Sequence, residues 1–376
     1  MIRKHEFRIR GFVLSDSDIL ILFPLLFLSG IGIVMVYSAS SALALRKFGS
    51  DYHFLIRQAV FVMIGFVLMF LCRQIPLKLI RSFTYPILGI SLGLLIGVLI
   101  PGLGVSAGGA VRWLRFGTYT FQPAEFARFA LVLYLAYSLE KKEERIKEFS
   151  IGFVPHVLIM GLICLPVLRQ PDFGTAVILF AVTWIMMFAG GVRIRHLGMS
   201  LLLVLLLVWF LIISTPYRMK RWTSFTDPWK YACDEGYQTI HSLMAFGSGG
   251  IWGAGVGKGY QKLFYLPEPH TDFIFSVLGE ELGLVGVLAV ILCYAVIVRQ
   301  GMIIARNTDD FFLSLLATGL TVSLGLQVCI NMGVALALLP TKGLTLPFLS
   351  YGGTSLLVNM ASVGILMNIG MSQYEK

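Results

Sequence analysis

The sequence predicts an all-α integral membrane protein, a polytopic bundle of about ten transmembrane helices that forms one domain over residues 1–376. The chain is 57% hydrophobic and 13% charged, whereas a soluble domain carries roughly 25% charged residues. Apolar runs of about twenty residues recur along it, a length that lets an α-helix cross the hydrocarbon core. Since a spanning segment must satisfy its own backbone hydrogen bonds, we expect these runs to be helical.

Ten apolar runs qualify as spans, and polar, Pro-rich or Gly-rich stretches separate them. The basic segment MIRKHEFRIR before the first run is interpreted as a cytoplasmic leader, because that run is long enough to span and to remain in the protein. The expected spans are residues 17–40, 55–72, 79–100, 123–139, 151–168, 173–190, 197–214, 272–298, 310–337 and 349–371.

The distribution of Lys and Arg between the spans predicts cytoplasmic termini. With the N-terminus inside, the inner segments carry sixteen of these residues and the short outer loops carry seven. This asymmetry follows the positive-inside rule, and an even number of spans returns the C-terminus to the same side. The long loop 215–271, between the seventh and eighth spans, is then extracytoplasmic, and we expect it to fold back as short helices. Asp272 follows it at the outer membrane face.

Charge and cysteine content argue against a nucleic-acid-binding protein and against a protein built on disulfides or a metal site. A net charge of +10 would suggest a nucleic-acid partner for a soluble protein, but here the basic residues gather at span ends. Topology and contact with anionic lipid phosphates explain that placement, so no nucleic acid is expected. The five cysteines are scattered without the spacing of a disulfide framework or a metal site, and no metal ligands are predicted.

Ionisable residues gather in the stretch 262–283, KLFYLPEPHTDFIFSVLGEELG. Charge is costly near the hydrocarbon core, so such a cluster suggests a functional site. His270 and Asp272, with Glu125 elsewhere in the chain, are candidate acid–base groups, and Asp272 also suits the N-cap of the following helix. Glu280 and Glu281 lie more than about two helical turns deeper and are interpreted as structural or gating groups.

Three further motifs place polar residues at span ends. In QPAEFAR, Glu125 and Arg128 share a helix face, so they suit either a structural ion pair or a binding site. In RQPDFGTA, Asp172 suits the N-cap of the next helix. Lys342 lies in the stretch 338–353, where prolines and glycines prevent a continuous helix. It is either a cavity residue or a lysine that extends from a span end to the interface.

Basic and aromatic residues complete the expected outer face. Trp113 is either an interface anchor or a substrate contact. Several cations around a carboxylate suit an anionic amphiphile, because the cations hold a phosphate and the carboxylate takes a proton from a hydroxyl. The residues alone leave open a group transfer from a lipid-linked phosphate and a proton-coupled or lipid transporter. The basic residues are Arg57, Arg112, Arg115, Arg128, Arg221, Lys262 and Lys342.

Motifs from the first span to the last resemble the SEDS family (shape, elongation, division and sporulation). They are GIVMVYSAS, QPAEFAR, QPDFGTA, GSGG, KLFYLPEPHTDFIFSVLGEELGLVG and PTKGLTLPFLSYGGTS. The segments VYSAS, GVGKGYQKLFYLPE and PTKGLTLPFLSYGG are more similar to the division branch than to the elongation branch. The resemblance implies ten membrane helices, cytoplasmic termini and a large outer loop between the seventh and eighth helices.

The resemblance also implies an activity, the polymerisation of lipid II by peptidoglycan glycosyltransfer on the outer face of the bacterial cytoplasmic membrane, at the division septum. The implied partners are a class B penicillin-binding protein, which supplies the transpeptidase, and other division proteins within the lipid membrane. A lipid II flippase, an elongation polymerase and a catalytically silent scaffold are the alternatives. No cofactor is implied beyond a divalent cation, Mg²⁺ or Mn²⁺, as an alternative holder of the pyrophosphate.

The family's essential aspartate follows a His-Thr pair, which corresponds to Asp272. As general base it would deprotonate the 4-hydroxyl of the acceptor GlcNAc, which attacks C1 of the donor MurNAc and expels undecaprenyl pyrophosphate with inversion. The pyrophosphate is expected on a subset of Arg57, Arg128, Arg221 and Lys342. Position 128 departs from the pattern, since many members carry lysine there. The full set expected to bind substrate is Arg57, Trp113, Glu125, Arg128, Asp172, Arg221, Lys262, His270 and Lys342.

Overall fold

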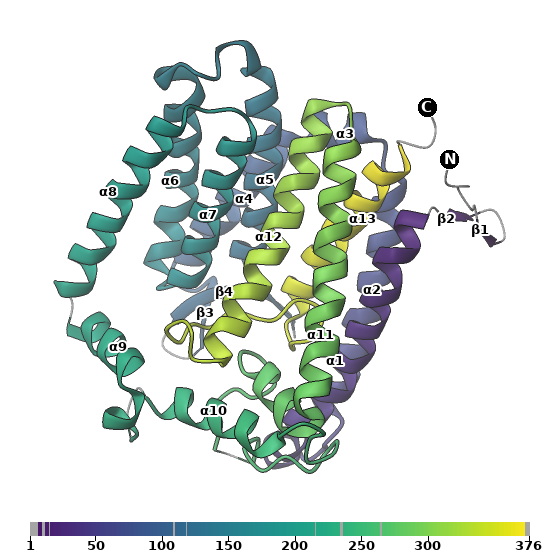
Figure 1. Cartoon of the computed structure of the whole chain (residues 1–376), viewed down its shortest axis with the longest axis vertical. Helices are drawn as coiled ribbons and strands as arrows, with labels where there is room; N and C mark the ends of the chain where they lie inside the picture. Colours follow the sequence, from purple (N-terminus) through teal and green to yellow (C-terminus); the bar gives the residue numbers. More distant parts are fainter. Residues whose placement is uncertain are drawn as a thin grey trace.

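The computed structural model shows a bundle of long helices with a small sheet and several short helices towards one end (Figure 1). It describes residues 7–9, 12–14, 16–107, 110–117, 119–214, 216–233, 236–263 and 265–372. The chain starts with an antiparallel hairpin of β1 (Phe7–Ile9) and β2 (Phe12–Leu14). This hairpin and the C-terminal end of the last helix, at Met371, lie on the same side of the bundle, in the upper half of Figure 1.

The long helices follow the apolar runs of the sequence. They are α1 (Asp16–Phe48), α2 (His53–Gln74), α4 (Thr84–Leu99), α5 (Pro123–Lys141), α6 (Val154–Arg169), α7 (Phe173–Ala189), α8 (Ile194–Ile213), α11 (Ile274–Asn307), α12 (Phe311–Ala335) and α13 (Gly353–Met371). Shorter helical segments are α3 (Leu77–Ser82), η1 (Glu143–Arg145), η2 (Phe149–Phe153), α9 (Pro216–Thr226), η3 (Pro228–Tyr231) and α10 (Tyr237–Gly249).

Length and composition identify six of the described helices as long and apolar enough to cross a membrane. They are α1, α2, α6 together with the η2 turn before it, α11, α12 and α13. The helices α4, α7 and the first part of α8 are apolar but shorter. The architecture is that of an all-α membrane protein.

The helix ends agree with the predicted spans to within about four residues, except at the start of α4 and the ends of α1 and α11. The span expected over 79–100 is divided into α3 and α4 at Phe83, so α4 begins at Thr84. Helix α1 continues to Phe48 instead of ending at 40, and α11 continues to Asn307 instead of ending at 298. The prediction was wrong there because neither SALALRKF nor RQGMIIARN contains a proline that would end the helix.

Helix α5 occupies the interior of the bundle, where it packs against α4, α7 and α12. Its side chains from Leu131 to Ala136 are all buried, which accounts for the absence of a polar face along this part of the helix. Polar residues near its N-terminal end therefore lie inside protein rather than in lipid. The pairs α2–α13 and α11–α12 form other extensive contacts.

A three-stranded antiparallel sheet replaces the Gly-rich loop that the sequence suggested between two spans. Its strands are β3 (Gly104–Ala107), β4 (Ala110–Phe116) and β5 (Tyr119–Phe121), with β4 in the middle. Trp113 on β4 pairs with Val105 on β3, and Leu114 pairs with Phe121 on β5. This pairing fixes the backbone around Trp113 at one end of α4 and α5.

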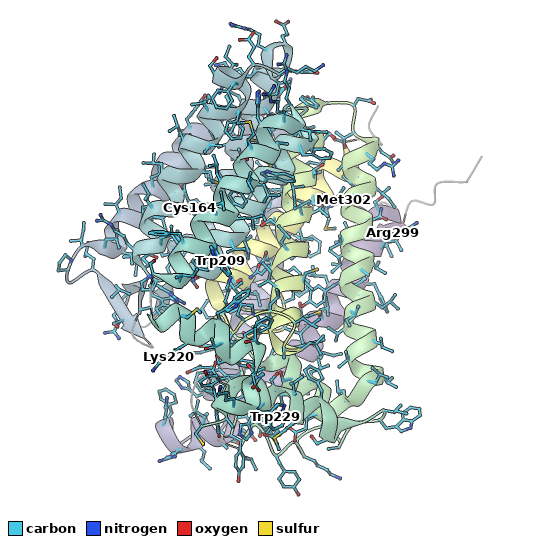
Figure 2. All side chains as sticks on the ribbon, turned by 60° about the vertical axis from the view of Figure 1, so that its left-hand side comes forward. Cys164, Trp209, Lys220, Trp229, Arg299 and Met302 are labelled. Carbon is cyan, nitrogen blue, oxygen red and sulfur yellow. The ribbon has the colours of Figure 1, made fainter. Side chains whose placement is uncertain are left out.

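The long loop between α8 and α11 contains the short helices α9 and α10, so the prediction of short helices in this loop is confirmed. They lie at the lower end of Figure 1. Figure 2 shows Lys220 of α9 and Trp229 near that end, whereas Arg299 and Met302 lie farther up α11. Helix α11 therefore runs from the α9–α10 end of the bundle towards the opposite end.

Candidate active site

A cavity of about 550 Å³ lies towards the α10 end of the bundle, a volume typical of sites for small molecules. Four parts of the chain enclose it: the sheet, the N-terminal ends of α2 and α5, the segment before α11, and the segment before α13. Its lining includes the polar and aromatic side chains of Arg57, Arg112, Trp113, Tyr119, Gln122, Glu125, Gln238, Glu268, Asp272, Lys342 and Tyr351.

Asp272 lines this cavity from the non-helical segment that precedes α11. The residue at the N-cap position of α11 is Phe273, and no side chain caps that helix end. The suggestion that Asp272 serves as the N-cap is therefore wrong, because the helix begins one residue too late for it. Its carboxylate is left to face the cavity.

Burial, together with the nearby carboxylates of Glu268 and Asp172, raises the pKa of Asp272 to about 7, although the positive charge of Arg112 opposes the shift. A carboxylate with a pKa near the working pH combines a useful deprotonated fraction with strong basicity. The geometry and charge around Asp272 therefore suit a general base.

Arg112 is held beside Asp272 by backbone carbonyl groups. Its Nε donates to the carbonyl of Gln170 over 3.2 Å, and one terminal nitrogen donates to the carbonyl of Pro171 over 2.5 Å. These bonds fix a positive charge at the edge of the cavity. Sequence reasoning grouped Arg112 with the basic residues but did not select it, because its partners are distant in sequence and no local pattern marks it.

Lys342 lines the cavity from the non-helical segment between α12 and α13. Its ammonium lies 4.7 Å from the centre of the Phe173 ring, a cation–π contact. Burial lowers the pKa of Lys342, and the nearby carboxylate of Asp172 opposes that effect. Of the two sequence-based interpretations, the structure supports a cavity residue over a lysine that extends to the membrane interface.

Asp172 acts as the N-cap of α7, as its sequence position predicted. Its Oδ1 accepts from the backbone N–H of Thr175 over 3.2 Å, and its Oδ2 accepts from the Thr175 hydroxyl over 2.8 Å. It does not line the cavity. Its influence on the site is electrostatic, through the effects on Asp272 and Lys342.

Glu125 and Arg128 form a buried ion pair of 2.8 Å between Oε2 and a guanidinium nitrogen. Arg128 also donates to Gln327 over 2.6 Å and to Asn359 over 3.2 Å. Glu125 reaches the cavity lining, but Arg128 does not. The arrangement favours the structural ion pair, and a pyrophosphate contact for Arg128 is not supported because protein acceptors occupy its guanidinium.

Two further residues of the expected binding set, Lys262 and His270, do not line the cavity. The ammonium of Lys262 pairs with Oε1 of Glu281 over 2.6 Å and donates to the Ser38 hydroxyl over 2.7 Å. The buried ring of His270 packs on Phe54, with 4.8 Å between ring centres. Substrate contacts by Lys262 and His270 are therefore not supported.

Three residues expected to bind substrate remain: Arg57, Trp113 and Arg221. Arg57 and Trp113 line the cavity, as expected for substrate contacts. Arg221 belongs to α9, and its side chain lies outside the described residues. The cavity thus brings together Arg57, Trp113, Glu125, Asp272 and Lys342.

Glu280 and Glu281 support a backbone break within α11. Gly283 has a φ of +65°, and the interrupted helix exchanges backbone hydrogen bonds with residues 250–255. Glu280 accepts from the backbone N–H of Tyr260 over 2.7 Å, and Glu281 accepts from that of Gly257 over 3.0 Å. These contacts hold the loop on the helix, which agrees with the structural interpretation of both glutamates.

The described residues contain no group of three His, Cys, Asp or Glu side chains that could hold a metal ion. A divalent cation would therefore depend on oxygens of a bound pyrophosphate in addition to the protein. We assign no step of the chemistry to a metal.

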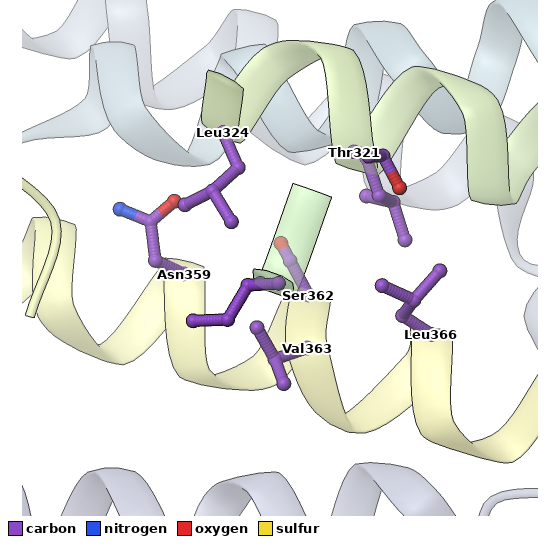
Figure 3. Close-up of a pocket in the computed structure, with 8 residues that line it drawn as sticks. Thr321, Leu324, Asn359, Ser362, Val363 and Leu366 are labelled. Atoms are coloured by element: carbon purple, nitrogen blue, oxygen red, sulfur yellow. The ribbon is translucent and has the colours of Figure 1, made fainter. Parts of the chain in front are cut away.

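A separate small cavity lies between α11, α12 and α13 (Figure 3). Thr321 and Leu324 of α12 face Asn359 and Ser362 of α13 across it. Its volume of about 10 Å³ is close to the minimum for a single water molecule. This cavity cannot hold a lipid-linked sugar, so the larger one is the candidate active site.

The fold and the site define an all-α membrane protein with a polar, charged cavity, lined by Asp272 and three cations, towards one end of its helix bundle. Residues 18–375 match the model of the FtsW/RodA/SpoVE cell cycle proteins. The chain belongs to this family.

Individual relatives cover nearly the whole chain. It is 43% identical over 353 residues to the "Probable peptidoglycan glycosyltransferase FtsW" of Geobacter sp. (strain M18), which covers 94% of this chain and 96% of the relative. It is 40% identical over 362 residues to stage V sporulation protein E of Bacillus subtilis (strain 168), covering 96% of this chain and 98% of the relative.

Solved structures share the fold. A chain from a structure described as "Structural coordination of polymerization and crosslinking by a peptidoglycan synthase complex" has a TM-score of 0.79 at 29% identity, covering 95% of this chain and 98% of that one. The rod shape determining protein RodA of Thermus thermophilus has a TM-score of 0.70 at 28% identity, covering 96% and 99%.

Proposed function

We propose that this chain is a peptidoglycan glycosyltransferase that polymerises lipid II into β-1,4-linked glycan strands during cell division, a role like that of FtsW. The observation that carries the proposal is Asp272 in a cavity lined by three cations, Arg57, Arg112 and Lys342. The relatives named FtsW, similar over nearly their whole length, support the same activity.

The proposed topology places this cavity at the outer face of the bacterial cytoplasmic membrane. The ten long helices α1, α2, α4–α8 and α11–α13 are the spans of a single domain over residues 1–376. Both termini are cytoplasmic, and 215–271 is the large outer loop. The bias of Lys and Arg towards the opposite side supports this orientation. A septal location follows from the division role.

In the proposed reaction, two lipid II molecules bind in the cavity. The Asp272 carboxylate accepts the proton of the acceptor GlcNAc 4-hydroxyl, and that oxygen forms a bond to C1 of the donor MurNAc. The bond from C1 to the pyrophosphate oxygen breaks, so undecaprenyl pyrophosphate leaves with the bonding electrons. One displacement converts an α-linked donor into a β-1,4 product, and no protein nucleophile is needed.

The cations lower the barrier by neutralising charge on the leaving group. Arg57, Arg112 and Lys342 would contact the pyrophosphate as negative charge develops there. The indole of Trp113 offers an apolar face to a sugar ring on the same cavity wall. Fixing both substrates in one cavity also converts an encounter of two molecules into a reaction within one complex.

A class B penicillin-binding protein is the proposed partner, which would crosslink the strands that this chain makes. The support is the similar chain found in a peptidoglycan synthase complex described by its polymerization and crosslinking. Lipid II enters from the surrounding membrane lipids.

The test is a polymerisation assay with purified protein and lipid II in detergent, with and without a class B penicillin-binding protein from the same cell. The proposal predicts glycan strands that a muramidase digests. Detergent abolishes sidedness, so a flippase or a silent scaffold would produce none. Absence of strands with the partner present, together with lipid II translocation in vesicles, would replace the polymerase with a flippase.

A further inference from the structure

Three successive carbonyl groups in the Asp272 segment each accept a hydrogen bond from the C-terminal part of the chain. The backbone N–H of Tyr351 donates to the carbonyl of His270 over 2.9 Å. The Ser350 hydroxyl donates to the carbonyl of Thr271 over 2.6 Å. The amide nitrogen of Asn331 donates to the carbonyl of Asp272 over 3.1 Å. The segment is thus held at three consecutive residues, although it belongs to no helix.

Both side-chain donors are themselves buried and fixed. Asn331 lies on α12 and also donates to the carbonyl of Leu344 over 2.5 Å. Only an NH₂ group can donate to two carbonyl oxygens, so the orientation of this amide is determined by its partners. The Ser350 oxygen accepts from the backbone N–H of Leu346 over 2.7 Å. Each side chain therefore joins the Asp272 segment to the 344–346 segment.

We propose that Asn331 and Ser350 are positioning residues that hold the Asp272 carboxylate where it meets the acceptor hydroxyl. Neither residue lines the cavity, so neither contacts substrate. Asp has only two rotatable side-chain bonds, so the position of its backbone largely determines where its carboxylate lies. This inference rests on the proposed role of Asp272 as general base.

Asn368 provides a matched control for Asn331. It is also buried, and its amide nitrogen donates to two backbone carbonyls, those of Cys72 over 3.3 Å and Ile75 over 2.6 Å. These partners lie at the C-terminal end of α2, away from the cavity. Asn331→Leu and Asn368→Leu each remove two such bonds with nearly unchanged side-chain size and no added charge. The two variants differ in the backbone they release: Asn331→Leu frees the Asp272 segment, and Asn368→Leu frees the C-terminal end of α2.

The first readout is the split between kcat and KM for lipid II. Asn331→Leu is expected to lower kcat about 100-fold while leaving KM unchanged, since a displacement of about 1 Å can cost that factor. Asn368→Leu is expected to keep the wild-type kcat. Equal losses in the two variants would mean that Asn331 acts only through stability and would overturn the proposal.

Ser350 supplies an independent variant in case Asn331→Leu does not fold. Ser350→Ala removes the hydroxyl and is expected to lower kcat in the same way, whereas Ser350→Thr keeps a hydroxyl and restores most of it. Ser91→Ala is the control, because Ser91 is buried and its hydroxyl donates to the carbonyl of Leu88 within its own helix. Wild-type kcat in Ser350→Ala would contradict the role of Ser350.

A second readout needs no lipid II. A hydrophobic carbodiimide modifies protonated carboxyl groups, so mass spectrometry of the Asp272 peptide over a pH series reports its protonation. Arg112, Glu268 and Asp172, the charged groups that act on Asp272, are unchanged in every variant. Asn331→Leu and Ser350→Ala release the Asp272 segment, so water should reach its carboxylate and lower the pH at which half of Asp272 is labelled. The control variants should leave this pH unchanged.

The two readouts separate this inference from the proposed function. If the wild type makes no glycan, the proposed function fails, and the labelling series still decides whether Asn331 and Ser350 position Asp272. If the wild type makes glycan but the labelling midpoint and kcat are unchanged in both variants, the positioning role alone fails.

Discussion

Oδ2 of Asp272 lies 3.1 Å from the point that a Cβ atom on Gly343 would occupy. A terminal nitrogen of Arg112 lies 3.7 Å from the same point. The glycine therefore leaves open the space beside both the carboxylate and the guanidinium. This relationship links the segment before α13 directly to the proposed chemistry.

Replacing Gly343 by alanine should reduce catalysis without disrupting the fold. The added methyl group would stand closer to Oδ2 than ordinary van der Waals contact and displace the carboxylate by a few tenths of an ångström. We expect kcat to fall roughly tenfold, measured as lipid II consumed per unit time. Gly30→Ala on α1 is the control, because a Cβ atom there meets nothing within 4 Å. An unchanged kcat in Gly343→Ala would show that the carboxylate position is not critical.

The rate of polymerisation should rise with pH through about 7. A general base works in its deprotonated form, and the pKa of Asp272 is about 7 because burial disfavours the charge. Arg112→Gln removes an opposing positive charge, so it should move this rise to higher pH. Glu268→Gln removes a negative charge and should move it to lower pH. The measurement is the kcat–pH profile of each variant. If the pH of the rise in kcat shifted in the same direction in both variants, this electrostatic account would be refuted.

The same pKa makes a prediction about stability. Between the ordinary value of 3.8 and about 7, the folded protein binds more protons at Asp272 than the unfolded chain does. Stability therefore falls as pH rises through this window. Asp272→Asn removes the penalty, so it should raise the melting temperature at pH 8 more than at pH 5. An equal change at both pH values would place the carboxylate in water rather than in a buried site.

Sequence patterns predicted the helices well because hydrocarbon thickness and helix-breaking residues limit where a span can begin and end. The sheet β3–β5 was missed, although Gly108 and Gly109 between two runs with β-branched residues are a signal for a hairpin. The ends of α1 and α11 were placed too early because helices extend beyond the apolar segment when nothing interrupts them.

Replacing Lys262 and Lys342 in turn by methionine distinguishes a lysine that stabilises the fold from one that contacts substrate in the cavity. Lys262→Met leaves the buried Glu281 carboxylate without its cationic partner, so it should lower the melting temperature. Lys342→Met should change the melting temperature less and lower the kcat for lipid II polymerisation, because Lys342 lines the cavity and is proposed to neutralise charge on the leaving pyrophosphate. The measurements are thermal unfolding in detergent and initial rates at several lipid II concentrations. The opposite pattern would restore Lys262 as a substrate contact.

The ion pair between Glu125 and Arg128 should be important chiefly for stability. Arg128→Met leaves the buried Glu125 charge unpaired, at a cost of about 3–5 kcal/mol in the free energy of unfolding. Adding Glu125→Gln removes that charge and should recover much of the loss, as judged by thermal unfolding of the single and double variants. Additive losses in the double variant would indicate that the two side chains act independently.

The composition of the site could be predicted only in part. Motif position identified Asp272, Arg57, Trp113 and Lys342, which the cavity brings together. Motif position could not show that Lys262, unlike these residues, does not line the cavity. The Lys262 ammonium is neutralised by Glu281, and that ion pair forms because the loop packs on α11 where the helix breaks at Gly283. Such pairings depend on three-dimensional contacts that no single segment encodes.

The most direct test of the central claim compares Asp272→Asn with the wild type in the lipid II polymerisation assay, with the class B penicillin-binding protein present. Asp310→Asn is the control, since Asp310 caps α12 and asparagine also serves as an N-cap. We predict glycan strands from the wild type and from Asp310→Asn, and none from Asp272→Asn. Full polymerisation by a stably folded Asp272→Asn protein would contradict the role of Asp272 as general base.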